Sequence, residues 1–197
     1  NGQTLCYVTS DPNDPILLTT QLQLNAFYIN KLLPLFMGIV NCKAFVMTLT
    51  DLNQFHIKRS ANPVHYVYVF HSPISTHLKY LQGAFNYYDS VLCVGPHHTR
   101  EIRRHEELHN LPKKELVKAG YYILEQIYSK YRDYLKVDTV RAKKTKVLVA
   151  PSWGNNNVLE SCGERLIELL LENGYEIIIR PHPEIIRRNP KLIDMLD

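Results

Sequence analysis

Short apolar runs alternate with amphipathic segments along this chain, and that alternation limits the possible folds more than any other feature. The runs have the length of β-strands, whereas the segments between them repeat their apolar residues with the period of an α-helix. Strands and helices in regular alternation are typical of βα units, in which parallel strands form a sheet. The sequence therefore predicts an α/β protein with parallel sheets.

The predicted strands are rich in β-branched and aromatic residues and cover residues 4–11, 44–51, 64–70, 90–95, 147–150 and 177–179, with a shorter one from residue 116 that turns at Gly120. The predicted helices cover residues 17–37, 74–88, 96–109 and 158–172. Pro34 is expected to kink or end the first of these helices.

A basic segment separates two blocks of this alternation. Its basic residues face only two acidic ones, and they are Lys130, Arg132, Lys136, Arg141, Lys143, Lys144 and Lys146. We predict a Rossmann-like domain over residues 1–127, a basic linker over 128–145, and a second Rossmann-like domain over 146–197. Both domains are expected to be incomplete, because the first strand starts at once and the last segment stops without closing a sheet.

Composition excludes several classes of protein. The 197 residues are 45% hydrophobic and 21% charged, as in ordinary globular proteins. The net charge of +4 is small for a dedicated nucleic-acid binder, so no nucleic-acid partner is expected. An anionic ligand or a membrane surface stays open as a partner.

The cysteines and the apolar segments bear on the compartment. Cys6, Cys42, Cys93 and Cys162 form no CxxC pair, which predicts reduced, buried thiols in a cytoplasmic protein. The longest apolar stretch, residues 32–40, has about half of the roughly 20 residues that cross a bilayer. No secretory signal pattern is visible at the N-terminus.

Residues 105–109 match HExxH, the motif of zinc-protease helices. The flanking residues are polar all round, and Pro112 follows closely, so we interpret the segment as a solvated helix face and expect no metal. The nearby His97 and His98 begin the same helix. They could approach a ligand or simply be exposed at the helix start.

The turn between residue 150 and the helix predicted from residue 158 is a candidate phosphate contact. Hydroxyl, amide and backbone N–H groups at a helix N-terminus suit an anion, and the candidates are Ser152, Trp153, Gly154 and Asn155. An equally good interpretation is a helix cap in which an asparagine is the N-cap.

Two histidines differ from the other seven because each follows an apolar strand and has a proline close behind it. His71 precedes Ser72 and Pro73, and His182 lies between two prolines, with Arg180 two residues earlier. Ligands of open α/β sheets bind where strands end. An imidazole and a guanidinium on one side of an extended backbone could hold a phosphate oxygen. The alternative is a structural histidine that bonds to backbone groups.

Several of these stretches occur in the order of a known family. Residues 70–102 (FHSPISTHLKYLQGAFNYYDSVLCVGPHHTREI), LVKAGYYILEQI, KVLVAPSWG and YEIIIRPHPE together resemble the CDP-glycerol glycerophosphotransferases, which build teichoic-acid-like polymers. The resemblance implies a GT-B fold, two Rossmann-like domains that face each other across a cleft. It also implies catalytic histidines at His71, from an HGTP-type motif, and at His182, from an RPHP-type motif.

The chain departs from the family pattern at two places. Ser72 stands where glycine is usual, and Gly120 to Ile123 stand where a GxPR-type turn is common. The resemblance implies a CDP-glycerol donor with no further cofactor, and a lipid-linked acceptor at the inner face of the plasma membrane. Two alternatives stay open. One is a nucleotide-sugar glycosyltransferase or epimerase of the same fold, and the other is a non-catalytic basic binding module.

Overall fold

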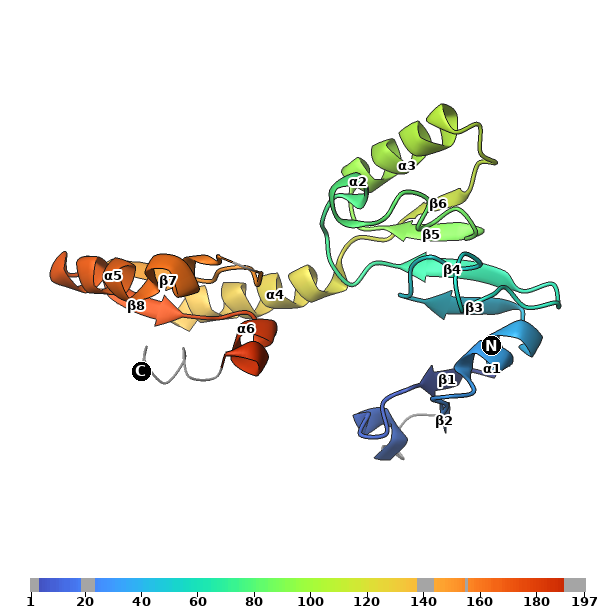
Figure 1. The fold of residues 1–197 in the computed structure, drawn as a ribbon, viewed down its shortest axis with the longest axis horizontal. Helices are drawn as coiled ribbons and strands as arrows, with labels where there is room; N and C mark the ends of the chain where they lie inside the picture. The colour runs from blue at the N-terminus through green and yellow to red at the C-terminus, as the bar shows by residue number, and fades with distance from the viewer. Residues whose placement is uncertain (1–3, 19–23, 138–143, 155, 190–197) are drawn as a thin grey trace. The chain divides into compact units, whose positions relative to one another are not determined.

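The computed structural model describes residues 4–18, 24–137, 144–154 and 156–189 (Figure 1). The chain divides into two compact units, unit 1 (Asn1–Tyr128) and unit 2 (Ser129–Asp197). Every pair of neighbouring strands in the described residues is parallel. The predicted α/β class with parallel sheets is therefore confirmed.

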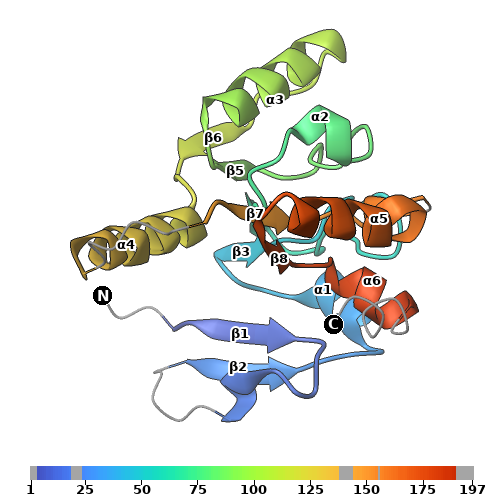
Figure 2. The ribbon, with the colours of Figure 1, turned by 90° about the vertical axis from the view of Figure 1, so that its left-hand side faces the viewer.

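The main sheet of unit 1 has four strands that are adjacent in space in the order in which they occur in sequence. They are β3 (Ala44–Met47), β4 (His65–Val69), β5 (Ser90–Cys93) and β6 (Glu115–Lys118). Helices α2 (Thr76–Lys79) and α3 (Pro96–Leu108) contact each other and lie beside β5 and β6 (Figures 1 and 2). The carboxyl ends of all four strands consequently lie along one edge of the sheet.

Aromatic side chains form the centre of the unit 1 core. Tyr66 and Tyr68 alternate on β4 and are fully buried. The ring of Tyr68 lies 4.8 Å from the ring centres of both Phe70 and Phe85, within the range of favourable aromatic pairs. Because Phe70 is itself buried, the core extends to the residue just before His71.

The helix expected over residues 17–37 is wrong. That region contains the 3-10 helix η1 (Pro15–Leu18), the strand β2 (Asn25–Tyr28) and the helix α1 (Leu33–Ile39), while residues 19–23 lie outside the described residues. β2 pairs in parallel with β1 (Cys6–Thr9). Hydrogen bonds between these two strands, which are separated in sequence, therefore replace the local hydrogen bonds of a helix. Pro34 begins α1 rather than ending a helix, because the first turn needs no N–H from it.

The helix expected over residues 74–88 is also wrong, apart from the single turn of α2. Tyr80 is already extended, and Gly83 has a positive φ of 84°, which interrupts a right-handed helix. Phe85 and Tyr88 are buried in the core. Tertiary packing of these aromatic residues thus overrides the local helical pattern.

In its described residues unit 2 contains two parallel strands and two complete helices of its own. They are β7 (Lys146–Val149), α5 (Val158–Glu172), β8 (Glu176–Ile179) and α6 (Pro183–Arg188). The strands and the long helix lie where the sequence predicted them. The core is small, since only Val149, Leu159 and Ile185 among its described hydrophobic residues are buried.

Most of the basic segment predicted as a linker is helical. Helix α4 (Tyr122–Val137) starts in unit 1 and continues into unit 2, and residues 138–143 lie outside the described residues. None of the helices in the described parts is long and apolar enough to cross a membrane.

Burial of the four thiols differs from the expectation. Cys93 is buried and Cys42 is half-buried, but Cys6 and Cys162 are exposed. All four are free thiols. The apolar neighbours of Cys6 and Cys162 in sequence therefore did not predict burial: Cys6 begins a strand of a two-stranded sheet, and Cys162 lies on an exposed part of α5.

Candidate functional site

His71 follows β4 at the carboxyl edge of the four-stranded sheet. Its side chain is exposed, and no described residue forms a hydrogen bond or ion pair with its imidazole. Its backbone carbonyl accepts a hydrogen bond of 2.9 Å from the Tyr121 hydroxyl, which lies beyond the end of β6. The backbone at His71 is thus held while both ring nitrogens stay open to a ligand.

Residues 71–76, which we call the His71 loop, form hydrogen bonds with side chains of helix α3. His97 Nε2 donates to the Pro73 carbonyl at 3.1 Å, and His98 Nε2 donates to the Ile74 carbonyl at 2.8 Å. Glu101 accepts from both the backbone nitrogen and the hydroxyl of Thr76, at 2.6 and 2.7 Å. These four hydrogen bonds, at Pro73, Ile74 and Thr76, define the path of this loop, a form of preorganisation that catalytic sites need.

His98 is the most deeply placed of these anchors. It is fully buried, with its ring centre 3.9 Å from that of Phe70, so the interpretation as an exposed helix-start residue is wrong. Burial lowers the pKa of His98, which keeps the imidazole neutral at neutral pH. Because Nε2 carries the donated proton, Nδ1 has the lone pair, and this buried atom has no partner among the described residues.

Glu101 stays ionised at the opposite end of the loop. Partial burial alone would raise the pKa of Glu101, but the hydrogen bonds from Thr76 outweigh it and lower the pKa below its usual range. Sequence reasoning missed both Glu101 and Tyr121. The only local signal was the helical spacing of His97, His98 and Glu101, three polar residues on the first turns of one helix.

The HExxH match belongs to the structure of unit 1. Glu106 is buried, where it accepts from Arg103 at 2.5 Å and from the Lys114 backbone at 2.9 Å. The solvated-face interpretation is therefore wrong for Glu106, and this carboxylate is not free to activate a water. His105 contacts Asn86 at 3.1 Å. The described residues contain no group of three side chains that could hold a metal ion.

In unit 2, His182 is the N-cap of α6. Its Nδ1 accepts a hydrogen bond of 3.1 Å from the Glu184 backbone nitrogen, which leaves Nε2 as the ring atom open to a ligand. The His182 ring centre is 6.1 Å from that of Trp153, and the Arg188 guanidinium lies 4.6 Å above the Trp153 ring. The structure thus brings together two predicted residues, and it adds Arg188, which the sequence analysis missed.

The turn before α5 is a helix cap. Asn157 accepts from the backbone nitrogens of Leu159 and Glu160 at 3.0 and 3.2 Å, and donates to the Gly154 carbonyl at 3.3 Å. These contacts use two of the N–H groups that an anion at the helix N-terminus would need. The cap interpretation is therefore correct at Asn157.

The remaining predicted residues are distributed over both units. Ser72 is half-buried in the His71 loop, whereas Ser152 and Arg180 are exposed in unit 2. The Arg180 backbone nitrogen donates to the Val149 carbonyl at 2.9 Å, which extends the pairing of β7 and β8 to the residue before Pro181. Asn155 lies outside the described residues.

These residues form two local arrangements, one in each unit. In unit 1 an exposed imidazole, which has no hydrogen-bond partner among the described residues, lies on an anchored loop at a strand end. In unit 2 a capping imidazole lies near an indole ring and a guanidinium. Comparisons with protein-family models, with curated proteins and with solved structures find no match to this chain.

Proposed function

We propose that this chain belongs to a transferase that moves glycerol phosphate, or a related polyol phosphate, from a CDP-linked donor to an acceptor hydroxyl. One observation carries the proposal. Each unit presents a histidine just beyond the end of a parallel strand, His71 after β4 and His182 after β8. The sequence resemblance to the CDP-glycerol glycerophosphotransferases supports the same two residues, with the two units paired as in a GT-B fold.

In this proposal His71 is the general base. An imidazole titrates near neutral pH, so it can accept a proton from an acceptor hydroxyl. The exposed ring of His71, free of contacts with described residues, is available for this role. The anchors on the His71 loop contact backbone carbonyls and Thr76, so they restrict the loop without occupying the base.

His182 and Arg180 stabilise the negative charge of the pyrophosphate. The ring nitrogen Nε2 of His182 can donate, because Nδ1 already accepts from the helix backbone. Electrostatic stabilisation of this kind dominates phosphoryl transfer. Trp153, exposed beside His182, offers an aromatic face on which a cytosine ring could stack.

The reaction is a displacement at phosphorus. The acceptor oxygen attacks the β-phosphorus of CDP-glycerol, its proton passes to His71, and the bond from this phosphorus to the bridging oxygen breaks. CMP leaves with the bridging oxygen. The acceptor gains glycerol phosphate, and a lipid-linked acceptor would bring the protein to a membrane surface.

The proposal is tested by measuring CMP release from CDP-glycerol by the intact protein with a glycerol-phosphate acceptor. His71→Ala and His182→Ala should each lower turnover by about 100-fold or more, the usual contribution of a general base or of one electrostatic stabiliser. His56→Ala, which changes an exposed histidine on another loop of unit 1, is the matched control and should keep wild-type turnover.

Retention of near wild-type turnover by either variant would refute the assignment. A thermal-shift comparison separates the donor classes, because a ligand raises the unfolding midpoint only if it binds the folded state. Stabilisation by UDP-sugars, with none by CDP-glycerol, would replace this proposal with a nucleotide-sugar transferase or epimerase.

A further inference from the structure

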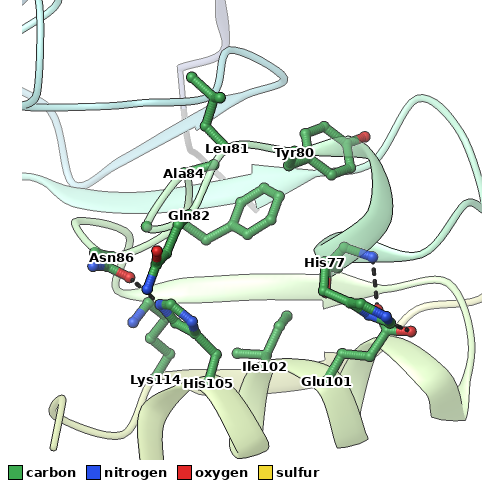
Figure 3. A pocket seen from close by; sticks show the side chains of 13 residues that line it. His77, Tyr80, Leu81, Gln82, Ala84, Asn86, Glu101, Ile102, His105 and Lys114 are labelled. Carbon is green, nitrogen blue, oxygen red and sulfur yellow. Dashed lines mark hydrogen bonds and ion pairs between the residues drawn. The ribbon is translucent and has the colours of Figure 1, made fainter. Parts of the chain in front are cut away.

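Unit 1 contains a pocket of about 310 Å³ between α3 and the segment that follows α2 (Figure 3). This volume lies at the lower end of the range for small-molecule sites. Neither His71 nor any other residue named as a candidate catalytic or phosphate-binding residue lines the pocket, although His105 of the HExxH match does. The pocket is therefore a separate feature of unit 1, although it shares Thr76 and Glu101 with the anchors of the His71 loop.

One end of the pocket carries a buried cation. The Lys114 side chain lines the pocket, and the residue is only 7% exposed. Its ammonium group lies 3.8 Å from Glu106, which is an ion pair but longer than a hydrogen bond. Glu106 also pairs with Arg103 at 2.5 Å. Two cations therefore share one carboxylate, which leaves a net charge of about +1 at this end.

The groups that line the pocket around Lys114 are hydrogen-bond donors, and Asp89, a carboxylate that also attracts Lys114, is already paired with Arg59. Figure 3 shows Asn86 and His105 at the same end of the pocket, and the carbonyl of Asn86 accepts from His105 Nε2 at 3.1 Å. The Asn86 amide nitrogen is then a further donor at this end. Burial lowers the pKa of both His105 and Lys114. His105 is therefore neutral at neutral pH. An anion beside Lys114 would favour the charged ammonium group, which burial disfavours.

The rest of the lining is largely apolar. Leu81 and Ile102 lie between the two ends (Figure 3), and Phe85 also lines the pocket. At the far end His77 Nδ1 lies 3.5 Å from Glu101 Oε1. The Glu101 carboxylate accepts two hydrogen bonds from Thr76, and its negative charge repels an anion from the far end. The positive charge that can attract an anion is thus at Lys114.

We propose that this pocket binds a small organic monoanion, with its carboxylate against Lys114 and Asn86 and its apolar body between Phe85 and Ile102. A single net positive charge matches a carboxylate, whereas a phosphate dianion would bury excess negative charge. A volume of about 310 Å³ accommodates a body of one ring or a short branched chain.

The test is a titration of the intact protein with benzoate and with benzamide, its neutral analogue of nearly equal shape, followed by NMR of the His105 ring protons. Benzoate should shift these signals with at least about tenfold higher affinity than benzamide, the difference expected from one charge-assisted contact. Lys114→Met should remove that preference. Lys113→Met, which changes the exposed neighbouring lysine, should keep it.

A second variant keeps the proposal testable if Lys114→Met does not fold. Leu81→Trp changes a lining residue that is 67% exposed, so it can fill the pocket without disturbing the core, and it should abolish binding of both probes. Equal affinity for benzoate and benzamide, no binding of benzoate, or benzoate binding unaffected by Leu81→Trp would each overturn the proposal. These outcomes do not depend on transferase activity.

Discussion

The two strand-end histidines share a sequence pattern but have different structural roles. His71 has an imidazole with no partner among the described residues, and its loop is held through backbone carbonyls and Thr76 by residues of α3 and by Tyr121. His182 uses its own Nδ1 to cap α6. A histidine next to a proline at a strand end therefore predicts where the imidazole lies, but not which of its nitrogens is free.

The surroundings explain this difference. The aromatic core of unit 1 extends to Phe70, so a packed helix stands beside the His71 loop and can supply anchors. In the described part of unit 2 only three hydrophobic residues are buried, and the chain after β8 is held mainly by the local turn into α6. The larger core thus provides long-range anchors, while the smaller one depends on a local cap.

The largest expected effect comes from the residues just before the two sites. Phe70→Ala removes a buried ring from the core and should lower the free energy of unfolding of unit 1 by about 3–5 kcal/mol. Ile179→Ala, at the half-buried end of β8, should lower that of unit 2 by only about 1–2 kcal/mol. Hydrogen exchange of the β4 and β8 amides in the two variants measures both values. Equal losses would show that the two strand ends are supported alike.

A second effect concerns the pH dependence of the His71 anchors. The pKa of His98 is lowered in the folded state, so its contribution to stability is fully present above its ordinary value of about 6.5 and is lost as the pH falls through the lower folded value. The free energy of unfolding should therefore decrease as the pH falls from about 7.5 through about 6.5, until the folded protein is protonated as well. His98→Gln, which can still donate to the Ile74 carbonyl, should reduce this decrease.

The control for this experiment is His105→Gln. The pKa of His105 is also lowered by burial, so this residue accounts for part of the same decrease. Urea unfolding at each pH measures the change. A decrease of unchanged size in the His98 variant would mean that the buried imidazole does not titrate with folding.

The smallest expected effect on stability is at His182, and it distinguishes a role in capping α6 from a role in the transfer reaction. His182→Ala should destabilise α6 by about 0.5–2 kcal/mol, whereas His182→Asn should keep most of the stability because asparagine is a good N-cap. Both variants should lose transfer activity if the imidazole acts on the pyrophosphate. The fluorescence of Trp153, the single tryptophan, reports unfolding beside this helix. Equal destabilisation by alanine and asparagine would exclude the capping role.

Sequence reasoning succeeded where an element depends on its own residues. The apolar runs of β4, β7 and β8 and the amphipathic pattern of α5 predicted these elements close to their observed positions. It failed at β2 and in the segment after α2. There, pairing with a distant strand and burial of Phe85 and Tyr88 outweigh local helical preference.

The parallel α/β class and the positions of His71 and His182 at strand ends follow from the sequence alone, because periodicity and proline act within a few residues. Tertiary packing is what buries His98 against Phe70, brings Glu101 and Tyr121 to the His71 loop, and makes Glu106 an ion-pair partner. Each of these outcomes depends on the depth of burial and on how the side chains of α3 are packed. A linear pattern of residue types does not contain that information.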